Sequence, residues 1–223
     1  MSIKDNLLKI KSTLPEHVTL VAVSKTKPVA DLMEAYNAGQ RIFGENKIQE
    51  MTEKWEQMPK DIQWHMIGHI QTNKVKFMAP YVSLIHGVDS LKLLEEINKQ
   101  ALKNNRIIDC LLQIHIAEEE TKFGLNNDEL ADLLVSESFK NLKNINIVGL
   151  MGMATFTSNQ NQIKKEFVYL KSIFDTNKSL SIVNCHLSIL SMGMSGDYQL
   201  AISCGSTMVR IGSLLFGARV YNK

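Results

Sequence analysis

Residues 18–28 of this 223-residue chain read VTLVAVSKTKP. The apolar and β-branched run from Val18 to Val23 predicts a short buried strand, and a polar turn follows it. The helical segment that comes next, Pro28 to Ala38, has proline in its first turn and Gly39 at its end. We take this strand–turn–helix order as the building unit of the chain.

The same alternation recurs along the sequence, after an opening helix at about Ile3 to Ser12. The expected strands are Val18 to Val23, Arg41 to Phe43, Gln63 to Ile67, Val82 to Val88, Ile107 to Ile116, Ile145 to Met151, Cys185 to Leu190 and Thr207 to Ile211. Strands joined by helices run parallel, because a helix-length crossover returns the chain to the same edge. Eight units predict one α/β domain over residues 1–223, a closed (β/α)8 TIM-type barrel with an extra N-terminal helix. An open doubly wound sheet is the alternative, although its usual strand number fits less well.

Composition and charge exclude several classes of function. The chain is 44% apolar and 22% charged, with a formal charge of +2 and its basic residues scattered, so we expect no nucleic-acid partner. No apolar run approaches the roughly 18 residues of a membrane helix, which indicates a cytoplasmic protein. The three cysteines stand at unrelated spacings and support neither a disulfide framework nor a metal clip.

Lysine 25 follows the first predicted strand, at the end of a barrel where chemistry is usually found. Alternation along the strand puts Val21, Val23 and Lys25 on one face, so the Lys25 amine should point into the barrel mouth. An amine held there can attack a carbonyl carbon to form a Schiff base. The competing interpretation is a solvated loop lysine, which is the commoner role of any single lysine.

Small and hydroxylated residues gather after the last two predicted strands, as LSMGMSGD at 190–197 and GSTMVRIG at 205–212. Small residues let backbone N–H groups approach an anion, and the loops after strands seven and eight are the usual phosphate cradle of this fold. Arg210 adds a fork of donors suited to phosphate. Ordinary turn chemistry with a structural arginine is the alternative. Together with Lys25, these loops favour a phosphate-bearing aldehyde as ligand.

Two further predicted strand ends carry polar residues. Asn46 follows the second strand, where it either hydrogen-bonds a ligand ring or caps the next helix. His65 and His69 have the spacing of a helical metal pair, but Gly68 indicates a strand-to-loop transition and no third ligand is evident. We therefore expect no metal.

Taken together, these stretches resemble a known family, the pyridoxal phosphate homeostasis proteins, also called the YggS or proline synthase co-transcribed group. The motifs that carry the resemblance are VAVSKTKP at 21–28, FGEN at 43–46, WHMIG at 64–68, QTNK at 71–74, EETKFG at 119–124, GLM at 149–151, LSMGMS at 190–195, GSTMVRIG at 205–212 and FG at 216–217. The chain departs from the family at His115, where asparagine is usual, and lacks a Gly-Arg pair before Val18.

The resemblance implies a barrel of the alanine racemase N-terminal type (fold type III) with pyridoxal 5′-phosphate (PLP) joined to Lys25. It further implies that Ser195, Arg210 and Gly212 hold the phosphate, that Ser191, Met192 and Thr207 line that end, and that Asn46 lies near the ring. The family handles the cofactor and has no established reaction, so we expect a non-enzyme that binds PLP through a Schiff base and acts in PLP homeostasis.

Storage and delivery of PLP, with transient contact to PLP-dependent apo-enzymes, is thus the leading hypothesis. Racemases of this fold carry a second, β-rich domain, for which this chain has no room, and no acid–base partner opposite Lys25 can be named. We expect a monomer on the same ground. A weak amino-acid racemase, a Schiff-base aldolase without PLP and a partner-binding regulator stay as alternatives. Lys122 is a candidate second PLP site, or simply a loop lysine paired with Glu119.

Overall fold

Eight parallel strands close into a barrel in the order β1 to β8, with β1 also paired to β8. The computed structural model describes residues 2–119, 122–179 and 184–218. The strands are β1 (Thr19–Val23), β2 (Ile42–Glu45), β3 (Gln63–Met66), β4 (Leu84–Val88), β5 (Ile108–Gln113), β6 (Ile145–Met151), β7 (Cys185–Met194) and β8 (Met208–Ile211). The predicted barrel is confirmed, and closure between β1 and β8 excludes the open sheet.

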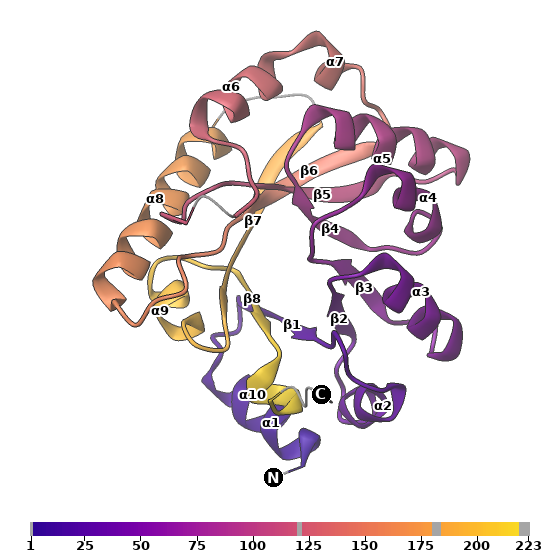
Figure 1. Cartoon of the computed structure of the whole chain (residues 1–223), viewed down its shortest axis with the longest axis vertical. Helices are drawn as coiled ribbons and strands as arrows, with labels where there is room; N and C mark the ends of the chain where they lie inside the picture. The colour runs from indigo at the N-terminus through magenta and orange to yellow at the C-terminus, as the bar shows by residue number, and fades with distance from the viewer. Residues whose placement is uncertain (1, 120–121, 180–183, 219–223) are drawn as a thin grey trace.

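Helices surround the strands (Figure 1). They are α1 (Ile3–Thr13), α2 (Val29–Asn37), α3 (Ile48–Gln57), α4 (Val75–Met78), α5 (Leu91–Lys103), α6 (Asn127–Val135), α7 (Glu137–Lys140), α8 (Gln160–Lys178), α9 (Tyr198–Ser203) and α10 (Ser213–Phe216), with a 3₁₀ turn η1 (Thr72–Lys74). The opening helix predicted at Ile3 to Ser12 is present, and Ser2 caps it through a capping box with Asp5. In the described ranges, no helix combines the length and the apolar character that crossing a membrane requires.

Two strands run further than the sequence predicts. β2 continues past Phe43 to Glu45 because Gly44 and Glu45 pair with His65 and Met66 of β3. β7 continues past Leu190 to Met194, since Ser191 pairs with Met151 of β6 and with Met208 of β8. These extensions carry polar side chains into the barrel wall itself.

The barrel has an outer and an inner core. The outer core packs helices against the barrel, and it holds most of the buried apolar residues. The inner core is small, and its buried members are Val21, Leu84, Leu111, Met151 and Met208. Toward the carboxyl ends of the strands the buried residues become polar, as at His65, His86, Ser191 and Arg210. Apolar side chains thus fill the interior of the barrel, and polar side chains lie toward the carboxyl ends of the strands. This arrangement is typical of the fold.

Candidate ligand pocket at the mouth of the barrel

A cavity of about 360 Å³ opens at the carboxyl ends of the strands. Its lining residues come from the ends of six strands (β1, β2, β3, β6, β7 and β8) and from the segments that follow them: Val23, Lys25, Lys27, Asn46, Ile67, Met153, Phe156, Met194, Ser195, Gly196, Arg210, Gly212, Ser213 and Gly217. Five of the residues singled out from the sequence, Lys25, Asn46, Ser195, Arg210 and Gly212, are therefore brought together here. The volume suits a small cofactor.

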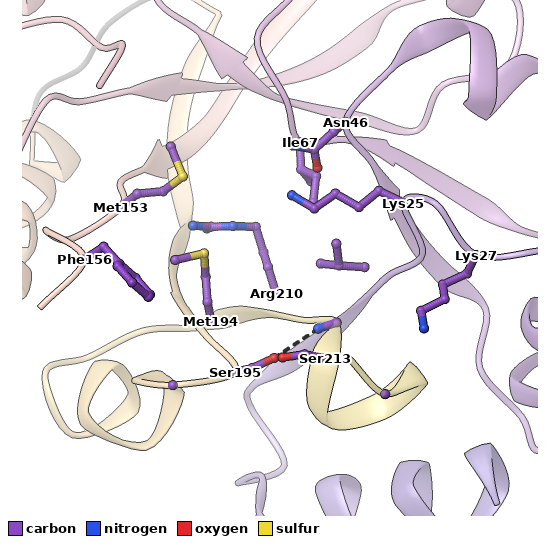
Figure 2. A pocket seen from close by; sticks show the side chains of 14 residues that line it. Lys25, Lys27, Asn46, Ile67, Met153, Phe156, Met194, Ser195, Arg210 and Ser213 are labelled. Atoms are coloured by element: carbon purple, nitrogen blue, oxygen red, sulfur yellow. Dashed lines mark hydrogen bonds between the residues drawn. The ribbon is translucent and has the colours of Figure 1, made fainter. Parts of the chain in front are cut away.

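Lys25 stands in the turn directly after β1 and extends across the cavity (Figure 2). Val21 lies in the inner core and Val23 lines the cavity, so the alternation expected from the sequence carries on to Lys25. The side chain is half-buried. Its amine is therefore presented inside the cavity.

Ser195 and the backbone at the start of α10 form the polar end of the cavity. The Ser195 Oγ accepts hydrogen bonds from the Gly212 N–H at 3.3 Å and from the Leu214 N–H at 3.5 Å. A Cβ added at Gly212 would lie 3.1 Å from the Val23 carbonyl oxygen, so a side chain there would press on β1. We call Ser195, Gly196 and Gly212 the cradle. Its converging N–H groups and hydroxyl suit an anionic group such as phosphate.

Arg210 is 4% exposed and is held by the protein on one side of its guanidinium. Nη1 donates to the Ser191 carbonyl at 2.9 Å and to Ser191 Oγ at 2.7 Å, and Nη2 donates to the Gly152 carbonyl at 3.1 Å. Burial lowers the pKa of Arg210 to about 10, which leaves it charged at neutral pH. In Figure 2 the guanidinium lies on the opposite side of the cavity from Ser195. The cavity thus has a cradle at one end and a fixed cation at the other.

Behind Arg210, two histidines continue a hydrogen-bonded chain through the barrel interior. His86 Nδ1 lies 3.1 Å from Ser191 Oγ, and His86 Nε2 lies 3.1 Å from His65 Nδ1. Ser191 Oγ accepts from Arg210, and each ring contact pairs one donor with one acceptor according to the tautomer of the two neutral imidazoles. Burial lowers the pKa of His65 to about 3 and that of His86 well below its usual value. Both imidazoles are therefore neutral and orient Arg210.

The wall between the two ends is apolar, with one unmatched acceptor. Met153, Met194 and Phe156 face the cavity, and Phe156 is 92% exposed at its rim. Asn46 Oδ1 is buried and has no hydrogen-bond partner among the described residues. A planar ligand carrying one hydrogen-bond donor would match this wall, because a buried acceptor left unpaired is unfavourable.

Three residues from the sequence expectations lie away from the cavity lining. Met192 packs in the outer core. Thr207 precedes β8, at the other end of the strand, where its Oγ1 accepts from the Leu190 N–H at 2.8 Å. Lys122 forms an ion pair with Glu119 at 2.8 Å, while Glu120 and Thr121 of the same motif lie outside the described residues. Ser191 does not line the cavity either, but it accepts a hydrogen bond from Arg210, which does.

Several residues of the site escaped the sequence analysis. His86 stands within the apolar run Leu84–Val88, where a lone polar residue was the only available signal. Lys27 lines the cavity, and its Nζ donates to the Phe216 carbonyl at 2.7 Å and to the Ala218 carbonyl at 3.3 Å. It thereby ties the turn after β1 to the far end of α10. The two histidines of the predicted metal-like spacing are separated, since His65 is buried in the barrel and His69 stacks on Phe123.

Comparison with known proteins places the chain among relatives of one kind. The family model of the alanine racemase N-terminal domain matches residues 1–220. The pyridoxal phosphate homeostasis protein of Aquifex aeolicus is 40% identical over 203 residues, which are 91% of this chain and 87% of that protein. The protein of the same name from Pasteurella multocida is 37% identical and is matched over the full length of both chains.

Solved structures agree with the sequence relatives. PipY of Synechococcus elongatus with PLP bound is 34% identical and superposes with a TM-score of 0.87, covering 97% of this chain and 100% of PipY. An alanine racemase of Clostridium difficile is 16% identical with a TM-score of 0.78, and the match spans 99% of this chain but 57% of the racemase. The racemase likeness concerns the fold of the barrel alone.

Proposed function

Because this chain belongs to the alanine racemase N-terminal domain family and, within it, to the pyridoxal phosphate homeostasis proteins, we propose that it binds PLP through a Schiff base on Lys25. It acts in PLP homeostasis by storing the cofactor and passing it to apo-enzymes. The observation that carries the proposal is that Lys25 extends into the cavity onto which the cradle opens. The PLP-bound relative supports the choice of ligand.

The described residues fit the cofactor at both of its ends. Ser195 and the Gly212 N–H accommodate the phosphate, and the unpaired Asn46 Oδ1 accepts a hydrogen bond from the ring substituents or the lysine nitrogen. Arg210, which the sequence grouped with Ser195 and Gly212 around the phosphate, is held by Ser191 and Gly152 and in this proposal supplies positive charge at the end away from the cradle. The bound cofactor supplies an aldehyde that condenses with an amine: a C=N bond forms, the C=O bond breaks and water leaves. Water or an incoming amine reverses this link, which suits storage and release.

The cavity offers little for turnover of an amino acid. Besides Lys25, the ionisable side chains among its described lining residues are Lys27 and Arg210, and the lining contains no Asp, Glu, His, Tyr or Cys. Racemisation requires an acid–base group on each face of the reacting carbon. The Lys27 amine is already bonded to the Phe216 and Ala218 carbonyls. This absence among the described lining residues supports a binding protein over a racemase.

Adding PLP to the purified protein should give a yellow species whose reduction by borohydride fixes the cofactor on one peptide, the peptide that contains Lys25. Absorbance spectra before and after reduction, followed by peptide mass mapping, measure this. A modified peptide without Lys25 contradicts the proposed attachment site. A colourless protein that is trapped only with a sugar phosphate would instead indicate an aldolase.

Replacing Ser195 with alanine should weaken PLP binding by about three- to tenfold, because a charge-assisted hydrogen bond to the phosphate is lost. Pyridoxal, which lacks the phosphate, should bind both proteins equally. Equilibrium titration with the two ligands measures the difference, and Ser188→Ala, at an exposed serine of β7, serves as the control. Equal losses for PLP and pyridoxal would show that Ser195 does not act on the phosphate.

A further inference from the structure

The turn that carries Lys25 is anchored on both sides by one helix. Before Lys25, the Ser24 carbonyl accepts a hydrogen bond from Lys54 Nζ at 2.8 Å. After it, the Thr26 N–H donates to Glu50 Oε1 at 2.6 Å. Lys54 and Glu50 are one turn apart on α3. The two peptide groups that adjoin Lys25 are thus both held by α3.

The anchoring groups form a buried ion cluster with Glu45 at the end of β2. Lys54 Nζ lies 2.7 Å from Glu45 Oε1 and 2.7 Å from Glu50 Oε1, so its three donors all have acceptors. The side chains of Glu45, Lys54 and Glu50 are 0%, 7% and 23% exposed. Ser24 Oγ also donates to Glu45 Oε1, at 2.6 Å. We call Glu45, Glu50 and Lys54 the clamp.

A clamp of this kind is a poor way to hold a helix on a barrel. Removing charges from water costs more than their attraction returns unless the geometry is favourable, and apolar side chains of similar size serve packing equally well. Burial raises the pKa of the Glu45 carboxyl even with Lys54 beside it, which reflects that cost. The clamp also hydrogen-bonds the Ser24 and Thr26 peptide groups. Apolar side chains could not make these contacts.

The turn needs such holding because its backbone is strained. Thr26 has φ = 64°, in the left-handed region. The other non-glycine residues with positive φ in the described ranges are Asn105 and Asn184, and asparagine tolerates this conformation. A β-branched residue does not, and such strain persists only where its surroundings enforce it.

We infer that the clamp is a positioning device for Lys25, which holds the strained turn so that the amine stays inside the cavity, in reach of the aldehyde carbon of the cofactor. This inference rests on the proposed function. It adds the residues that place the reacting amine, none of which lines the cavity. Without the clamp, the turn relaxes and the Lys25 amine spends more time in solvent.

The test compares Glu50→Ala with Glu50→Gln. Glutamine keeps an oxygen that can accept the Thr26 N–H, whereas alanine removes it. We expect Glu50→Ala to weaken PLP binding about tenfold and to raise the rate at which trace acetic anhydride acetylates Lys25 in the cofactor-free protein, by about threefold relative to Lys99. Glu50→Gln should restore most of both properties. Glu137→Ala, which breaks the exposed ion pair with Lys140, is the control and should change neither.

A second pair of variants tests the strain. Glycine adopts a positive φ freely, so in a Thr26→Gly background the turn needs less holding and Glu50→Ala should weaken PLP binding less than about threefold. The melting temperatures of all variants are measured beside these properties. If Glu50→Ala unfolds, the paired substitution Glu45→Gln with Lys54→Met replaces it. This pair removes the two most buried charges together, leaves only the partly exposed Glu50 carboxylate, and should also weaken PLP binding because the Ser24 carbonyl loses its donor.

The inference is overturned if Lys25 acetylation and PLP binding are unchanged in Glu50→Ala, if Glu50→Gln is as impaired as Glu50→Ala, or if the Thr26→Gly background leaves the loss undiminished. These results are separable from failure of the proposed function. Acetylation of Lys25 is read in the protein without PLP, so it reports on the clamp even if the cofactor proves to be attached to another lysine.

Discussion

Lys25→Ala is expected to abolish the borohydride-stable adduct with PLP and to weaken retention of the cofactor by about 100-fold or more. The lost C=N bond is the one covalent link in the proposed complex, and the cradle and Arg210 offer only hydrogen bonds and charge in its place. The adduct is measured as the intact protein mass after reduction, and retention as the PLP that survives gel filtration. Lys27 is a poor substitute, because two carbonyls already hold its amine.

Lys25→Arg is the matched variant, since it keeps the positive charge in the cavity but remains protonated and forms no C=N bond. It should lose the adduct as completely as alanine does, while it retains more non-covalent PLP. Lys99→Ala, on the exposed face of α5, should behave as the unchanged protein does. An adduct of full stoichiometry on the Lys25→Ala protein would contradict the attachment site and leave the cradle as the only supported part of the pocket.

The barrel and the entrance of Lys25 into its mouth could be predicted because both follow from local pattern. The alternation along Val18 to Val23 determines on which face of the strand the Lys25 side chain lies. Closure of the barrel between β1 and β8 then brings residues 195 and 212 next to Lys25. The ends of β2 and β7 were predicted too early. A strand continues while its neighbours supply hydrogen-bond partners, and polar side chains such as Ser191 do not prevent that.

The support behind the site could not be predicted, because it consists of contacts between distant segments. His86 and Ser191 are 105 residues apart and meet only across the barrel interior. From the sequence, Lys54 is expected to be a surface lysine of an amphipathic helix. In the structure it is buried and forms an ion pair with Glu45. Thr207 shows the converse error: the sequence grouped it with Arg210, but strand geometry puts the two toward opposite ends of β8.

Acidification from pH 7 to pH 5 is expected to lower the free energy of unfolding by about 2 kcal/mol through His65, and to lower it further through His86. The ordinary pKa of histidine is 6.5, whereas burial holds that of His65 at about 3 in the folded protein, with His86 also depressed. Between these values the unfolded chain binds protons that the folded chain does not. The stability is therefore complete above pH 6.5 and is lost progressively as the pH falls toward 3.

Urea unfolding at the two pH values measures this loss, and His86→Asn tests its origin. The variant is less stable at pH 7, yet its stability should depend less on pH, because it lacks one histidine whose pKa is lowered in the folded protein. His17→Asn, at an exposed position, should keep the full pH dependence of stability. Stability that is equal at pH 5 and pH 7, or a loss that His86→Asn leaves intact, would show that these imidazoles do not cause the pH dependence of unfolding.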